Sequence, residues 1–245
     1  MVVDAASAIV VELSDVVFSW PAVARPVVNV ASLRIARGER VFLRGPSGSG
    51  KSTLLSLLAG VVTPQAGAIR MLGTDLSALR GAERDRFRAD HVGYIFQMFN
   101  LIPYLSVLEN VCLPCGFSAA RAAKAKRTAP DVREEARRLL DHLDMGSAEV
   151  LRRPVTELSV GQQQRVAAAR ALMGAPDLVL ADEPTSALDA DRRAAFLELL
   201  FRECERAAAT LVFASHDVSL APRFDRTIDV SARLHDPQPG HQEPA

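Results

Sequence analysis

Short apolar runs separated by polar turns fill the first part of the chain. Ile9 to Val17 and Val27 to Ile35 are rich in β-branched residues and partly alternate in polarity, so both predict strands. Arg40 to Arg44 is a shorter apolar run that leads into a loop of glycine and serine. A helix is expected after that loop, from Lys51 to about Ala59.

Three later apolar runs each end in polar residues that can do chemistry. Runs this short and apolar are typical of strands in a parallel sheet covered on both faces. Because ligands bind at the carboxyl edge of such sheets, we expect the residues that follow the runs to share one site. The runs are Val92 to Phe96 before Gln97, Leu178 to Ala181 before Asp182 and Glu183, and Leu211 to Ala214 before Ser215 and His216.

The middle of the chain has a helical pattern instead. The clearest helix is expected from Val132 to Met145, with Gly146 as its stop. We therefore expect an α/β fold in a single domain over 1–245, with a helical segment inserted into the core and a flexible tail. The expected bounds are 9–96 and 175–230 for the core, 98–173 for the helical segment and 236–245 for the tail.

Composition narrows the class of protein. The 245 residues are 49% hydrophobic and carry 29 Lys and Arg against 29 Asp and Glu, which argues against disorder and against binding to nucleic acid. The N-terminal residues lack the basic start of a secretory signal, and no apolar run approaches the roughly 18 residues of a membrane span. Three cysteines do not make a disulfide scaffold, so we expect a reducing cytosol.

The glycine-rich loop matches the phosphate-binding pattern G-x-x-x-x-G-K-[ST]. Its backbone N–H groups and the helix after it can hold phosphate oxygens. Lys51 is expected to reach the β- and γ-phosphates, and Ser52 to place its hydroxyl on Mg²⁺. The predicted ATP-binding residues are Gly45, Pro46, Ser47, Gly48, Ser49, Gly50, Lys51, Ser52 and Thr53.

Two adjacent carboxylates follow the run at 178–181. If the strand geometry persists, their side chains point to opposite sides and have different roles. Asp182 is expected to face Mg²⁺, and Glu183 to face the attacking water as base or polariser.

The sequence Leu158-Ser159-Val160-Gly161-Gln162, followed by Gln163, Gln164 and Arg165, resembles the signature of ATP-binding-cassette (ABC) ATPases. The resemblance runs from about residue 10 to 230. It implies a P-loop NTPase core with a mixed sheet, flanking helices, an N-terminal antiparallel β subdomain and an inserted helical subdomain. It also implies a Q-loop at Gln97 that reaches Mg²⁺ or water, a switch histidine at His216 and an adenine contact at Trp20, although Trp20 could instead be a core or rim aromatic residue. The D-loop would be Ser186, Ala187, Leu188 and Asp189.

Ser159 and Gly161 precede a helix expected from about Gln162 to Met173, and a helix start with a serine hydroxyl makes an anion site. The resemblance implies that Ser159, Val160, Gly161 and Gln162 bind the γ-phosphate held by a second protomer. Val160 departs from the family pattern, which has glycine there. A positive φ at this position would strain valine, but we expect that none is needed.

The resemblance also indicates partners. The segments 96–103 and 106–111 look like the lipoprotein-releasing, macrolide-efflux and cell-division branch (LolD-, MacB- and FtsE-like). This implies a homodimer in the ATP-bound state, with a heterodimer possible, bound peripherally to a membrane-spanning permease at the cytoplasmic face of the inner or plasma membrane. Alternatives are an importer ATPase, a non-transport ABC ATPase and a P-loop kinase or GTPase.

Three further features of the sequence are a cysteine pair, a basic run and an apolar segment. Cys112 and Cys115 form a C-x-x-C pair, for which a structural role is favoured over redox or metal chemistry. The basic run from Arg121 to Arg127 predicts a solvated helix face, with contact to anionic lipid or a partner as the alternative. The resemblance places the groove for the membrane subunit in the region of Phe99, Leu101, Ile102, Leu105 and Val107, although some of these residues could belong to the core.

Overall fold

The computed structural model describes residues 9–21, 25–186, 188–230 and 234–235, so the expected tail at 236–245 lies outside the described residues. The strands are β1 Ile9–Phe18, β2 Val28–Ala36, β3 Arg40–Arg44, β4 Ala66–Met71, β5 Thr74–Asp75, β6 Val92–Ile95, β7 Leu178–Asp182, β8 Thr210–Ser215, β9 Arg226–Asp229 and β10 Leu234–His235. The helices are α1 Lys51–Leu58, α2 Gly81–His91, α3 Val107–Phe117, α4 Ala119–Thr128, α5 Val132–His142, α6 Ala148–Arg152, α7 Val160–Leu172 and α8 Ala190–Arg206, with 3₁₀ turns at Val155–Glu157 and Val218–Arg223.

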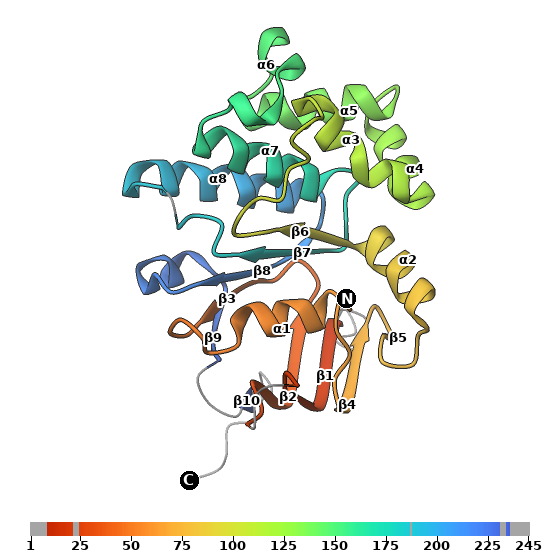
Figure 1. Ribbon diagram of the computed structural model, residues 1–245, viewed down its shortest axis with the longest axis vertical. Helices are drawn as coiled ribbons and strands as arrows, with labels where there is room; N and C mark the ends of the chain where they lie inside the picture. Colours follow the sequence, from red (N-terminus) through yellow and green to blue (C-terminus); the bar gives the residue numbers. More distant parts are fainter. Residues whose placement is uncertain (1–8, 22–24, 187, 231–233, 236–245) are drawn as a thin grey trace, which may run out of the picture.

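The strands form two sheets (Figure 1). One has the order β6-β7-β8-β3-β9, and all its neighbours are parallel. The other has the order β10-β2-β1-β4-β5 and is antiparallel except where β10 pairs with β2. The predicted α/β fold with an antiparallel N-terminal part is therefore confirmed, with the strands divided between two sheets.

The parallel sheet is buried on both faces. Along β3, Phe42 belongs to the apolar cluster of the helical half, whereas Val41 and Leu43 belong to the cluster around α1. The same alternation places Val179 in the first cluster and Leu180 in the second. Because successive side chains of a strand point to opposite faces, a strand covered on both faces is apolar at every position. The continuous apolar runs in the sequence have this cause.

The helices α3 to α7 gather above the parallel sheet in Figure 1, and α1 lies below it. The end of α5 differs from the sequence-based expectation, because the helix stops at His142 and does not continue to Met145. Asp144 adopts a left-handed φ of 56°, and the Met145 N–H bonds back to the Leu140 carbonyl at 2.8 Å. This is a Schellman-type helix end that uses an aspartate, so Gly146 is not needed as the stop.

The start of α7 also differs from expectation. The helix begins at Val160, two residues before Gln162. The Ser159 hydroxyl accepts from the Gln162 N–H at 3.3 Å, and the Gln162 side-chain oxygen accepts from the Ser159 N–H at 3.0 Å. This reciprocal capping box begins the helix at Val160.

Candidate functional site

The loop between β3 and α1 turns on two left-handed glycines. Gly48 has φ 79° and Gly50 has φ 98°. A Cβ added at Gly50 would lie 2.6 Å from the Val27 carbonyl oxygen, so a side chain fits neither the conformation nor the space. The loop leads directly into the first turn of α1, where backbone N–H groups are free to hold an anion.

Lys51 begins α1 and is only 7% exposed. Its Nζ donates to the carbonyls of Gly45 at 2.7 Å and Pro46 at 3.2 Å. It also lies 3.5 Å from Glu183 Oε1 at the end of β7. The ammonium group is therefore held inside the loop, opposite a carboxylate.

Asp182 is the last residue of β7 and is buried. Burial raises the pKa of its carboxyl group, while a hydrogen bond from Ser52 opposes the rise. Its Oδ1 is buried without a hydrogen-bond partner. An unpaired carboxylate oxygen beside a serine hydroxyl is the kind of ligand set that Mg²⁺ accepts together with phosphate oxygens, so these residues fit the ion.

Glu183 corrects the expectation that strand geometry continues through both acids. The strand ends at Asp182, and Glu183 adopts a left-handed φ of 46°. Its Oε2 lies 2.9 Å from His216 Nδ1, at the end of β8. Since its other oxygen faces Lys51, both acids point to the phosphate loop, one through Ser52 and one through Lys51.

Gln97 follows β6 and is exposed at the same edge of the sheet. After Met98, the residues Phe99 and Asn100 have left-handed φ values of 58° and 48°. Such backbone costs about 1–3 kcal/mol at a bulky residue and persists only where neighbouring groups hold it.

A cleft of about 650 Å³ joins these parts, a size typical of sites for small molecules. Trp20 stands at its rim, 42% exposed, with its Nε1 donating to Thr53 Oγ1 at 3.3 Å and its ring edge-on to Phe18 at 5.0 Å. The structure thus places Trp20 at the rim of the cleft and not in the core, and its contact with adenine stays a prediction. The lining residues are Trp20, Val27, Ser47, Gly48, Ser49, Gly50, Lys51, Ser52, Thr53, Gln97, Glu183 and His216.

The predicted signature residues do not line this cleft. Ser159 and Val160 are exposed at the start of α7, and Val160 has no positive φ. Valine is therefore compatible with the backbone there, as expected. A Cβ added at Gly161 would find only Leu188 Cδ2, at 3.8 Å, so this part of the helix start is open to a group from outside the chain.

The predicted D-loop lies beside the start of α7. Leu188 is buried there and Asp189 caps α8 by accepting from the Arg192 N–H at 2.9 Å, whereas Ala187 lies outside the described residues. Arg193, which the sequence did not single out, donates to the Leu188 carbonyl at 3.0 Å and to Asp217, next to His216. No sequence signal marked this link, because the residues it joins come from separate elements.

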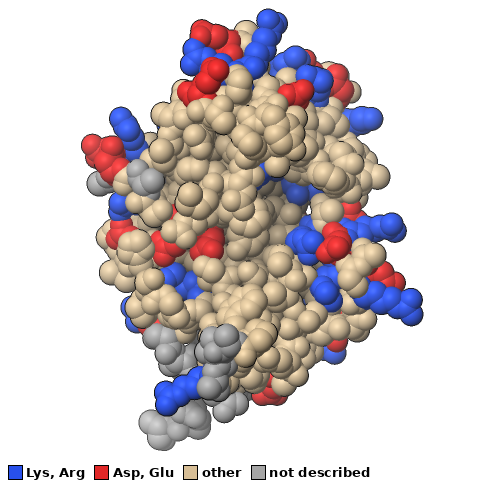
Figure 2. All heavy atoms as spheres, viewed as in Figure 1, with Lys and Arg blue, Asp and Glu red and all other residues tan. Residues whose placement is uncertain are grey.

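Some of the residues expected near the groove belong to the core, an alternative that the sequence left open. Phe99 and Val107 are buried in the core of the helical half. A groove of about 570 Å³ lies between α2 and α3, where Figure 2 shows Lys and Arg near the right-hand edge of the face. Its lining combines apolar residues with charged residues of α2 and with Arg121 of α4. The lining residues are Val61, Asp85, Arg86, Arg88, Ala89, Val92, Tyr94, Phe96, Pro114, Phe117 and Arg121.

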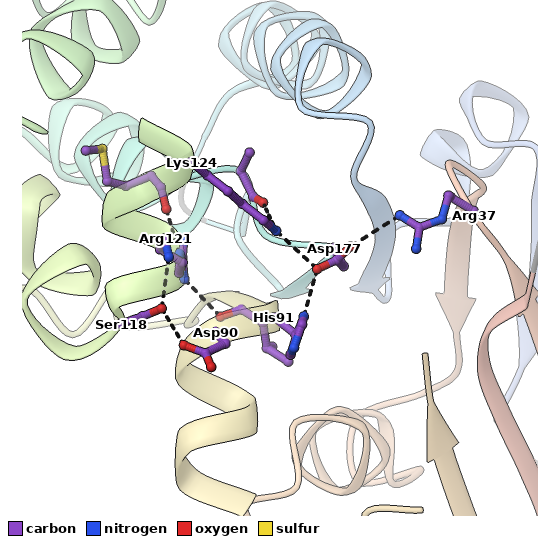
Figure 3. Close-up of polar contacts among 10 residues, drawn as sticks. Arg37, Asp90, His91, Ser118, Arg121, Lys124 and Asp177 are labelled. Atoms are coloured by element: carbon purple, nitrogen blue, oxygen red, sulfur yellow. Dashed lines mark hydrogen bonds and ion pairs between the residues drawn. The ribbon is translucent and has the colours of Figure 1, made fainter. Parts of the chain in front are cut away.

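The basic run does not form only a solvated face, as the sequence suggested. Arg121 is 3% exposed and donates to the carbonyls of Val92, Ala171 and Met173 (Figure 3). Lys124 donates to the Ala175 carbonyl and to Asp177. The hydrogen bond with His91 is the largest of the interactions that hold the pKa of Asp177 well below its usual range. These residues join α4 to the parallel sheet.

The C-x-x-C pair lies on α3. Burial raises the pKa of the Cys112 thiol to about 11 and also raises the pKa of Cys115, which disfavours reactive thiolates. No group of three or more His, Cys, Asp and Glu within the described ranges could hold a metal. No helix among the residues that the structure describes is long and apolar enough to span a bilayer.

Comparison with known proteins identifies the family. A family model for ABC transporters matches residues 28–186. The chain is 43% identical to the lipoprotein-releasing system ATP-binding protein LolD of Anaeromyxobacter dehalogenans (strain 2CP-C), over 90% of each chain. It is 40% identical to the ABC transporter ATP-binding protein YbbA of Escherichia coli (strain K12), over 82% of this chain and 85% of that one.

A solved structure agrees with these relatives. The dimeric post-hydrolysis structure of the ATP-binding cassette MJ0796, bound to ADP and Pi, superposes with a TM-score of 0.77 and 35% identity, over 89% of this chain and 93% of that one. The phosphate loop, the acidic strand end and the cleft between them therefore lie in a fold that this chain shares with the cassette MJ0796. The chain therefore belongs to the ABC transporter family, as an ATP-binding subunit that hydrolyses ATP.

Proposed function

We propose that this ATPase powers a separate membrane-spanning subunit of the lipoprotein-release or efflux type. The observation that carries the proposal is the 43% identity to LolD over nine tenths of both chains. The cargo would be bound by the membrane subunit, and ATP hydrolysis here would supply the conformational stroke. The subunit would lie peripherally at the cytoplasmic face of the membrane.

ATP would be held between two copies of the chain, or between this chain and a close homologue. Ser159 and Gly161 stay outside the cleft of their own chain, and the space over Gly161 is open. A twofold pair would bring each helix start to the partner's phosphate loop, so that both sites form at one isologous interface. The dimeric state of MJ0796 supports this arrangement.

The residues of the cleft would divide the chemistry. Glu183 would orient and polarise the attacking water, while His216 and Gln97 would contact the γ-phosphate and its surroundings. Ser52, Asp182 and Gln97 would hold Mg²⁺, which would supply positive charge beside the phosphates. Trp20 would stack against adenine, and the D-loop at 186–189 would lie against the partner.

The groove beside α2 would receive a helix of the membrane subunit. Its exposed apolar residues include Phe117, which is 78% exposed, next to Arg86 and Arg88. The helical subdomain at 98–173 would move against the core at 9–96 and 175–230 as ATP is bound and hydrolysed, within a single ABC domain over 1–245.

A pull-down tests this proposal. Tagged Glu183→Gln protein is recovered with ATP from detergent-solubilised membranes, and a Phe117→Glu version serves as the matched control for the groove. We expect a membrane partner with few spans and a large extracytoplasmic domain, lost in the Phe117→Glu control. A partner with many spans would indicate an importer, and only soluble partners would contradict a transport role.

A further inference from the structure

Arg170 makes a contact that the proposed site does not use. It lies in the last turns of α7, half-buried, and its guanidinium forks between two main-chain carbonyls. Nη2 donates to the Phe99 oxygen at 2.6 Å and Nη1 to the Asn100 oxygen at 2.7 Å. Arginine stays charged even when partly buried, and its planar fork suits two adjacent acceptors.

These two carbonyls belong to the left-handed turn that follows Gln97. Phe99 and Asn100 have φ values of 58° and 48°, and the Asn100 N–H bonds to the Met98 carbonyl at 2.6 Å. The Phe99 side chain is buried among the helices. Consecutive left-handed residues without glycine are sparsely populated, so the turn depends on outside support. Arg170 supplies that support at both carbonyls.

The start of β6, the strand that leads to Gln97, is also fixed to α7. A Cβ added at Gly93 would lie 2.2 Å from the Ala171 carbonyl oxygen, so the backbones of β6 and α7 are in direct contact. Arg121 donates to Val92 at 3.2 Å and to Ala171 and Met173 at 2.7 Å each (Figure 3). The helix α7 is thus held to the first residues of β6 and, through Arg170, to the turn that follows the strand.

We propose that Arg170 is a positioning residue that makes the Gln97 segment follow the signature helix. This inference rests on the proposed function, in which Ser159 at one end of α7 contacts the partner's nucleotide. A displacement of α7 on that contact would reach Gln97 of the same chain through the Arg170 fork. Each chain would then adjust its own site to the nucleotide bound by its partner.

The expected consequence is a separation of catalysis from binding. Neither residue to which Arg170 donates lines the nucleotide cleft, so the affinity for ATP should change little when Arg170 is replaced. Loss of the fork should leave Gln97 misplaced, and misplacement on the scale of 1 Å lowers kcat by about 10- to 100-fold. KM for ATP should stay within about twofold.

Arg170→Lys is the main test, because lysine keeps the charge and one donor direction but cannot fork between two carbonyls. Arg84→Lys is the matched control. Arg84 also donates to two main-chain carbonyls, those of Gly60 at 2.9 Å and Leu79 at 3.1 Å, away from the Gln97 turn. The readouts are kcat, KM, ATP affinity and the thermal unfolding midpoint of each full-length protein.

We expect Arg170→Lys to lose kcat with KM and ATP affinity preserved, while Arg84→Lys loses stability and keeps kcat. The inference is overturned if Arg170→Lys hydrolyses ATP within about twofold of the parent. It is also overturned if the two variants lose kcat equally, which would indicate a general structural effect. A parent protein that does not hydrolyse ATP would contradict the proposed function itself, and the inference with it.

Discussion

Replacing Glu183 by glutamine should lower kcat by at least about 100-fold while leaving ATP bound, because the amide cannot polarise the attacking water as a carboxylate does. Glutamine keeps the size of the side chain and can still bond to His216, which lies 2.9 Å from the carboxylate. The protein should then stay in its closed, ATP-bound dimer. Phosphate release gives the rate, and size-exclusion chromatography with light scattering gives the mass with and without ATP.

Glu198→Gln is the control for this substitution. Glu198 is exposed on α8 and pairs with Arg223, away from the cleft. It should hydrolyse ATP at the parent's rate. A Glu183→Gln protein that hydrolyses ATP as fast as this control would remove Glu183 from the reaction. One that binds ATP but remains monomeric would count against the two-chain site.

The second large effect is expected for Lys51→Ala, which should weaken ATP binding by about 10- to 100-fold through the loss of a charged hydrogen bond. Lys51 is buried and is held inside the loop by the carbonyls of Gly45 and Pro46. Trp20 is the only tryptophan of the chain and stands at the cleft, so its fluorescence reports binding directly.

Lys126→Ala provides the comparison, because it removes the same charge from the chain at a residue that is exposed on α4. Its fluorescence titration with ATP should match that of the parent. If Lys51→Ala binds ATP as tightly as Lys126→Ala does, the glycine-rich loop is not the phosphate site.

Much of the candidate site could be predicted because its residues lie at the ends of strands. Gln97, Asp182 and His216 each follow an apolar run, and strands that are parallel bring such residues to one edge of the sheet. The glycine-rich loop was recognisable for a similar reason. Its glycines meet backbone demands that other residues cannot meet, such as φ 98° and the 2.6 Å approach at Gly50.

The failures have a different cause. The left-handed backbone at Glu183 and Asp144 ends a strand and a helix without glycine, and local propensity gives no sign of either. The sequence predicts that Arg121 is part of a solvated basic run. Its guanidinium is instead buried and donates to carbonyls of residues that are more than 25 positions away in the sequence. Contacts of this kind depend on the assembled fold, not on the segment that carries the side chain.

The direct test of the two-chain site mixes two inactive variants. Lys51→Ala damages the phosphate loop, and Gly161→Asp places a negative charge where the partner's phosphate would lie. The nearest atom to a Cβ at Gly161 is 3.8 Å away, and an acidic residue suits a helix start, so the second variant should fold.

Each variant alone should be inactive, since every site in its dimer is damaged. In an equimolar mixture, half the dimers would contain one intact site, so ATPase activity should return to about a quarter of the parent rate. A mixture as inactive as its components, although both variants are folded, would contradict the claim that one chain's helix start completes the other chain's site.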